Sequence, residues 1–233
     1  MKKVVFLISG MLMLGLTGCM KSGENIQYYQ YIAAIVEWSP EFGFELQTSV
    51  GRIISTKVQN ATDLLSGEAV VAFFYVNFDQ QPSTEYTMAY DMEYYPITLT
   101  SPHPTSGGES VTGDFVTPIE GMYIQDMFVC DRYKPVIFIA FAHTAPTNQE
   151  FIYEMTYDPN ENTDAVYLRA KKKGQGTKAE ANIAYLYAFD MTYYLMTLKD
   201  SGKDIKLNLY YKTGEFDGKD VYSPWNENPL PLE

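Results

Sequence analysis

Apolar and polar residues alternate with a period of two along much of the chain. The clearest stretches are residues 86–94, 151–157, 166–171 and 205–212. Strict alternation places one side of an extended segment on a core and the other in water, as in an antiparallel sheet. We therefore expect a strand at each stretch. In the first stretch we expect one face to carry Tyr86, Met88, Tyr90, Met92 and Tyr94.

Three further segments break this alternation or compete with it. Residues 69–78 and 136–142 are almost continuously apolar and rich in Val, Ile and Phe, which predicts central strands covered on both faces. Residues 180–198 have the strongest helical pattern, but their aromatic residues alternate better than they follow a 3.6-residue repeat. We expect a strand there, followed by a turn. The chain is thus predicted to be all-β, in keeping with its 20 Tyr and 13 Phe residues.

One segment divides the pattern into two halves. Residues 101–118 contain three prolines and three glycines and show no alternation, which indicates a domain linker or a long exposed loop. We predict a first β domain at residues 27–100 and a second at 119–225, with a C-terminal tail at 226–233. The length of 233 residues is compatible with two small domains.

The N-terminus is typical of a bacterial lipoprotein. Two lysines, a short apolar run and the sequence Leu16-Thr17-Gly18-Cys19 resemble a signal peptide that ends in a lipobox. We expect residues 1–18 to be removed, Cys19 to carry acyl chains such as palmitate, and residues 19–26 to form a tether. The alternative is an ordinary signal peptide that happens to contain Cys19. The lipoprotein prediction locates the protein in the cell envelope, on the outer membrane, facing the periplasm or the exterior.

Composition excludes several classes of function. A formal charge of −12 opposes binding to phosphate backbones, so we predict no nucleic-acid partner. With Cys19 acylated, only Cys130 remains, and its apolar surroundings in sequence predict a buried, unreactive thiol. The two histidines, His103 and His143, belong to no recognisable metal or catalytic motif. We predict no cofactor and no metal.

Two weaker chemical possibilities rest on carboxylates. Asp91 with Glu93, or Asp126 with Asp131, would suit a carboxylate-dependent hydrolase, although solvated strand faces explain such pairs more simply. The acidic turn at residues 158–164 offers oxygen ligands for calcium but lacks the glycine and the final glutamate of an EF-hand loop.

Aromatic residues are the remaining signal. Tyrosines on the outward face of a sheet offer a contact surface for a sugar or a protein, whereas cross-strand packing is the structural alternative. The candidate binding residues are Tyr28, Tyr31, Trp38, Tyr194 and Tyr210.

Several segments resemble, in order, the NigD-like lipoproteins of Bacteroidetes. Besides the lipobox, they are residues 50–54, 68–78, 97–100, 121–124, 136–142, 151–157 and 188–191. The resemblance implies an N-terminal OB-like barrel followed by a C-terminal immunoglobulin-like antiparallel β-sandwich, and an association with bacteriocin production. It implies no enzymatic activity. The long loop at 101–118 departs from the shorter connection expected in that family.

Together these observations favour a lipid-anchored module that binds or assembles with an envelope protein and is not an enzyme. The alternative is a glycan-binding accessory lipoprotein of an outer-membrane polysaccharide-uptake system, which the aromatic residues suggest. The weaker alternative is the hydrolase. Fold alone does not decide between them.

Overall fold

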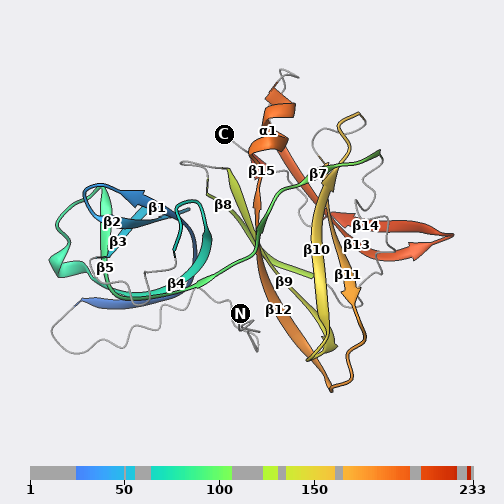
Figure 1. Ribbon diagram of the computed structural model, residues 1–233, viewed down its shortest axis with the longest axis horizontal. Helices are drawn as coiled ribbons and strands as arrows, with labels where there is room; N and C mark the ends of the chain where they lie inside the picture. The colour runs from blue at the N-terminus through green and yellow to red at the C-terminus, as the bar shows by residue number, and fades with distance from the viewer. Residues whose placement is uncertain are drawn as a thin grey trace. The chain divides into compact units, whose positions relative to one another are not determined.

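The computed structural model describes residues 25–49, 51–55, 64–106, 123–130, 135–160, 165–199, 206–224 and 230–231. These residues form two compact units that divide between Leu99 and Thr100. Each unit is built almost entirely from strands (Figure 1). The predicted all-β class is therefore confirmed.

The first unit is a closed five-stranded barrel. Its strands are β1 (Ile26–Ser39), β2 (Gly43–Thr48), β3 (Gly51–Ser55), β4 (Ala69–Asn77) and β5 (Tyr86–Pro96), with the short 3-10 helix η2 (Phe78–Gln80) after β4. The order around the barrel is β1-β2-β3-β5-β4, and β4 closes it by pairing with β1. The pair β3 and β5 is parallel, while the other pairs are antiparallel. This arrangement is the expected OB-like barrel.

Two β-bulges flank strand β4. In β1, Tyr29 pairs with Phe74 but Ile32 pairs with Ala72, so two residues of β1 oppose one of β4. In β5, a similar shift lies opposite the segment Phe73 to Tyr75. Each bulge contains a non-glycine residue in the left-handed region, Tyr31 at φ 57° and Asp91 at φ 49°. Such an inserted residue changes which face the following side chains occupy.

The bulge in β5 corrects one expectation for residues 86–94. We expected Tyr90, Met92 and Tyr94 to share a face. In the structure Tyr90 stacks on Tyr75 outside the barrel, whereas Met92 is buried and Tyr94 packs against the barrel core. The inserted residue at Asp91 reverses the alternation between Tyr90 and Met92.

The other apolar run of this unit, residues 69–78, is only partly as expected. Residues 69–72 are all buried, but Tyr75 is 38% exposed and Phe78 is 42% exposed. Strand β4 therefore begins covered on both faces and ends with one face open.

The second unit is a β-sandwich of two sheets. One sheet has the order β14-β13-β11-β10-β7, with β15 also paired to β13, and the other has the order β6-β12-β9-β8. The bounds are β6 (Leu99–Thr100), β7 (His103–Pro104), β8 (Tyr123–Cys130), β9 (Val136–Pro146), β10 (Glu150–Tyr157), β11 (Ala165–Lys173), β12 (Glu180–Asp190), β13 (Lys206–Phe216), β14 (Lys219–Pro224) and β15 (Leu230–Pro231). The predicted sandwich is confirmed, but it is not purely antiparallel, because β10 pairs with β7 and β11 pairs with β13 in parallel.

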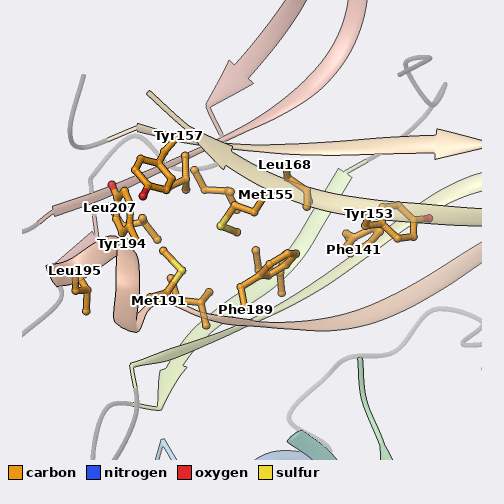
Figure 2. Packing of buried hydrophobic residues seen from close by; sticks show 14 of the residues in the cluster. Phe141, Tyr153, Met155, Tyr157, Leu168, Phe189, Met191, Tyr194, Leu195 and Leu207 are labelled. Carbon is orange, nitrogen blue, oxygen red and sulfur yellow. The ribbon is translucent and has the colours of Figure 1, made fainter. Parts of the chain in front are cut away.

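The core of this unit lies between its two sheets (Figure 2). Strand β9 is buried from Val136 to His143 on both faces, as the unbroken apolar run predicts. Its Ile137, Ile139 and Phe141 belong to one buried cluster with Tyr153 and Met155 of β10. At about 25 cal/mol per Å² of apolar surface, such burial is the main source of stability in a sheet pair.

A helix replaces part of the strand expected at residues 180–198. Strand β12 ends at Asp190, and helix α1 (Thr192–Lys199) follows. The Asp190 Oδ1 atom accepts hydrogen bonds from the Thr192 backbone N–H at 3.0 Å and from its hydroxyl at 2.5 Å. This contact forms a turn between the strand and the helix, and the first hydrogen bond of the helix runs from the Leu195 N–H to the Met191 carbonyl at 2.9 Å.

The predicted linker and tail each contain a short strand. His103 and Pro104 of β7 pair with Thr156 and Tyr157, so the start of the 101–118 segment is part of the sandwich. Residues 107–122 lie outside the described residues. In the tail, Leu230 pairs with Leu207. No helix in the described part of the chain is long and apolar enough to span a membrane.

Candidate functional site

Six aromatic side chains gather on the outer surface of the barrel, across the neighbouring strands β1, β4 and β5. We name this surface the aromatic face. It consists of Tyr28, Tyr31, Phe73, Tyr75, Tyr90 and Tyr95. Strand β4 lies between β1 and β5, so its two aromatic residues stand at the centre.

The first row of the aromatic face is a stack of three tyrosines. Tyr75 pairs with Tyr28 on one side and with Tyr90 on the other. The ring centroids are 4.5 Å apart for Tyr28 and Tyr75, with an interplanar angle of 29°, and 5.7 Å apart for Tyr75 and Tyr90, at 20°. Each flat side of the central ring therefore faces a neighbouring ring, and the residue Tyr75 is still 38% exposed.

The second row is built edge to face around Phe73. Tyr31 contacts Phe73 at 4.9 Å and 67°, and Tyr95 contacts it at 5.7 Å and 89°. Tyr31 is 41% exposed. Its left-handed backbone, at φ 57°, belongs to the bulge that directs its side chain outward. Left-handed backbone costs roughly 1–2 kcal/mol for an L-residue, so surrounding contacts must hold Tyr31 in this conformation.

The charge on the aromatic face is negative. Asp91 and Glu93 are exposed on β5, and Glu93 pairs with Phe73 of the second row. Burial raises the pKa of the Tyr28 hydroxyl, and the nearby Tyr75 and the charge of Glu93 raise it further. The Glu93 carboxylate therefore acts on a tyrosine two strands away. Strands β1, β4 and β5 contain no Lys or Arg.

The candidate residues taken from the sequence are only partly brought together. Tyr28 and Tyr31 both lie on the aromatic face. Trp38 is 62% exposed but lies at the far end of β1, where it contacts Phe44 of β2 at 5.6 Å. The structure brings it together with Phe44 and not with the two rows.

The two candidates in the second unit have different environments. The expectation that Tyr194 is exposed for binding is wrong. Its side chain is fully buried in the sandwich core, where the centroids of its ring and the Tyr157 ring are 4.9 Å apart (Figure 2). Helix α1 directs the Tyr194 side chain into the core. A strand at this position, as we expected, could have placed it on either the buried or the exposed face of the sheet. Tyr210 is partly buried and stacks on Tyr167 at 5.5 Å. Packing in the sandwich core thus explains Tyr194, and cross-strand packing explains Tyr210.

Sequence reasoning missed four members of the aromatic face. They are Phe73, Tyr75, Tyr90 and Tyr95. The signal in the sequence was the Phe-Phe-Tyr run within a stretch that we assigned to a strand covered on both faces. Only the pairing of β4 with both β1 and β5 shows that these rings meet.

A second cluster of polar aromatics lies inside the sandwich. His143 is fully buried on β9, and its Nε2 atom lies 2.6 Å from the hydroxyl oxygen of Tyr153. Its ring stacks on Tyr185 at 5.1 Å. Burial lowers the pKa of His143 to about 4; a backbone hydrogen bond at Thr144 opposes this shift, and Lys172 adds to it. The imidazole is therefore a neutral core group near pH 7.

The structure describes only some of the carboxylates and cysteines that we considered from the sequence. No three His, Cys, Asp or Glu side chains among the described residues are arranged to hold a metal ion. Asp158, from the acidic turn, is buried and accepts a hydrogen bond from the Asn160 backbone N–H at 2.8 Å. Cys19, Asp131 and residues 161–164 of that turn lie outside the described residues. Cys130 ends strand β8, opposite Val136.

Comparison with known proteins supports the fold. No protein-family profile and no curated protein sequence matches the chain. Solved structures do match: an uncharacterised protein from Parabacteroides merdae is 15% identical, with a TM-score of 0.60, over 84% of this chain and 96% of that protein. A NigD-like immunity protein from Bacteroides caccae is 10% identical, with a TM-score of 0.52, over 85% and 92%.

A third match is a candidate lipoprotein from Bacteroides fragilis. It is 11% identical, with a TM-score of 0.55, over 89% of this chain and 98% of that protein. These likenesses concern the fold. They confirm the resemblance to NigD-like proteins found in the sequence at the level of the fold.

Proposed function

We propose that this chain is a lipid-anchored, non-catalytic module of the cell envelope that binds its partner through the aromatic face. The observation that carries the proposal is the cluster of six aromatic side chains on one outer surface of the barrel, three of them, Tyr28, Tyr31 and Tyr75, between 37% and 41% exposed. Exposed aromatic clusters of this kind mark interaction sites.

The nature of the residues also favours binding over catalysis. Tyrosine supplies a large, rigid contact area and a hydroxyl group while losing little conformational entropy. The buried histidine has its pKa lowered to about 4 and lies in the core of the other unit, where it is out of reach for acid–base work at a surface. The NigD-like and lipoprotein names of two solved structures with this fold support an envelope location.

The proposal can be tested by binding to isolated envelopes of the producing cell. A fluorescent chain that begins at residue 20 avoids any contribution from acyl chains at Cys19. We expect saturable binding that weakens at least tenfold in the double variant Tyr28→Ser/Tyr75→Ser. The matched control is Trp38→Ser, which removes an exposed aromatic elsewhere on the barrel and should change binding less than twofold. Equal binding by both variants would refute a role for the aromatic face.

A further inference from the structure

The central ring of the aromatic face, Tyr75, has a neighbouring ring against each of its flat sides. A pyranose ring stacks on the flat side of an aromatic ring. In the first row, Tyr75 is covered by Tyr28 on one flat side and by Tyr90 on the other. In the second row, the contacts at 67° and 89° place ring edges against ring faces around Phe73. What Tyr75 exposes is therefore its edge and its hydroxyl group.

Ring edges and hydroxyl groups suit a protein partner better. Edges carry partial positive charge and attract carbonyl oxygens, and a phenol hydroxyl both donates and accepts hydrogen bonds. Protein recognition surfaces rich in tyrosine use these same properties. The row of three tyrosines runs across β1, β4 and β5, along the hydrogen-bonding direction of the sheet. It therefore offers a partner one continuous line of ring edges and hydroxyl groups, and not separate flat rings.

The charge of this unit indicates what such a partner carries. Residues 25–99 contain nine Asp and Glu but only two Lys and Arg, Arg52 and Lys57. Arg52 is already engaged, because its Nη2 atom lies 2.6 Å from Oε2 of Glu45. At the aromatic face, Asp91 and Glu93 are exposed and form no ion pair within the part of the chain that the structure describes. Complementary charge therefore means Lys or Arg on the partner.

We propose that the aromatic face binds a protein segment that presents Lys or Arg side chains to Asp91 and Glu93 while its backbone and apolar groups contact the tyrosine edges. This inference rests on the proposed function, since it names the partner class of the same surface. The two carboxylates attract the basic segment during association and determine its position along the aromatic face. The tyrosines supply most of the surface area buried in the complex.

Photo-crosslinking in the producing cell tests this proposal with the full-length protein. A benzophenone amino acid replaces Tyr75 at the centre of the face, or Trp38 as the control position. We expect protease-sensitive adducts from position 75 that are at least fivefold stronger than those from position 38. Mass spectrometry of the adduct should place a Lys or Arg within a few residues of the crosslinked site.

Charge variants separate a specific contact from general attraction to an acidic protein. In Asp91→Asn/Glu93→Gln, asparagine still tolerates the left-handed backbone at residue 91, and the adduct yield should fall at least fivefold. The matched control Glu41→Gln/Glu85→Gln removes the same two charges from exposed sites on loops of the same unit and should lower the yield less than twofold. An equal fall in both pairs would overturn the proposed contact.

The remaining outcomes distinguish this inference from the proposed function. If the labelled chain binds envelopes through the aromatic face but position 75 yields only protease-resistant, glycosidase-sensitive adducts, the partner is a glycan. The proposed function then stands and this inference fails. If envelope binding does not depend on Tyr28 and Tyr75 at all, both fail.

Discussion

Acidification should destabilise the sandwich through one buried histidine. His143 is fully buried between Tyr153, Phe151 and Tyr185, and its Nε2 atom shares a hydrogen bond with the Tyr153 hydroxyl at 2.6 Å. Burial lowers its pKa in the folded protein to about 4, against the ordinary value of 6.5. The unfolded chain therefore takes up a proton at a higher pH than the folded chain does.

The sign and the size of the effect follow from this difference. Above pH 6.5 the histidine is neutral in both states, and its full contribution to stability is present. As the pH falls from 6.5 to about 4, only the unfolded state binds the proton, so the free energy of unfolding decreases. At roughly 1.4 kcal/mol per pH unit, the loss reaches about 3 kcal/mol by pH 4, which is a large part of the roughly 5–15 kcal/mol that stabilises a typical domain.

Urea denaturation followed by circular dichroism between pH 7.5 and 4 measures this loss. Carboxylates titrate over the lower part of the same range, so the comparison must be with His143→Gln, which keeps a neutral hydrogen-bonding group beside Tyr153 but cannot titrate. We expect the transition of the sandwich to lose about 3 kcal/mol more in the wild type than in the variant. If the two units unfold in separate transitions, the transition that changes in His143→Gln belongs to the sandwich.

Nuclear magnetic resonance of labelled histidine gives an independent check. The chain has only two histidines, so the signal that disappears in His143→Gln belongs to His143. We expect that signal to stay in its neutral position from pH 7.5 down to 5. A midpoint at or above pH 6.5, or parallel stability profiles for wild type and variant, would refute the reasoning.

Three further predictions concern the backbone and the anchor. Asp91→Gly relieves a left-handed residue, at φ 49°, and should raise the free energy of unfolding by about 0.5 kcal/mol in urea denaturation; a loss above about 1 kcal/mol would contradict this. Gly176→Ala places a Cβ atom 2.6 Å from the Cβ of Pro146 and should lower the melting temperature, with a loss of about 1–3 kcal/mol. Gly214→Ala, with open space around it, should stay within about 0.5 kcal/mol. Cys19→Ala should abolish metabolic labelling with a fatty-acid analogue, and equal labelling of both proteins would disprove lipidation at this residue.

Much of the fold could be predicted because burial leaves a direct mark on the sequence. The unbroken apolar run at residues 136–142 became a strand buried on both faces, since only apolar residues are tolerated there. The alternating run at 151–157 became strand β10, with Tyr153, Met155 and Tyr157 in the core. These signals are local, and the two-residue period is sufficient to locate the strands.

The helix was missed because eight residues give too few turns for a period to stand out. Helix α1 buries Tyr194 and Leu195 together with Met191 and exposes Tyr193 and Met196, which is the spacing of a helix over little more than one turn. The decisive signal was Asp190, whose carboxylate accepts the Thr192 N–H. An Asp that accepts a backbone N–H two residues later marks a turn at the end of a strand, a signal that aromatic alternation does not carry.

The candidate site was only half predictable for a different reason. Tyr28 and Tyr31 stood out by their density in the sequence. Tyr75 meets Tyr28, and Tyr90 meets Tyr75, through strand pairings between residues 47 and 15 positions apart along the chain. The two-residue period locates strands without specifying their neighbours. Only the order β1-β4-β5 in the closed barrel makes one surface of these residues.

The two bulges show how this surface arises from a conflict within the sequence. Without an inserted residue, strand alternation would place Met92 on the same side as Tyr90 and turn Asp91 toward the barrel interior. The left-handed residue at Asp91 changes the phase, so Tyr90 stays outside while Met92 enters the core. The bulge at Tyr31 does the same on the opposite side of β4, where Ile32 packs against the core. The two left-handed residues are strained, but the shift in alternation at each of them lets apolar side chains fill the barrel interior. The same two shifts leave aromatic rings aligned on its outer surface.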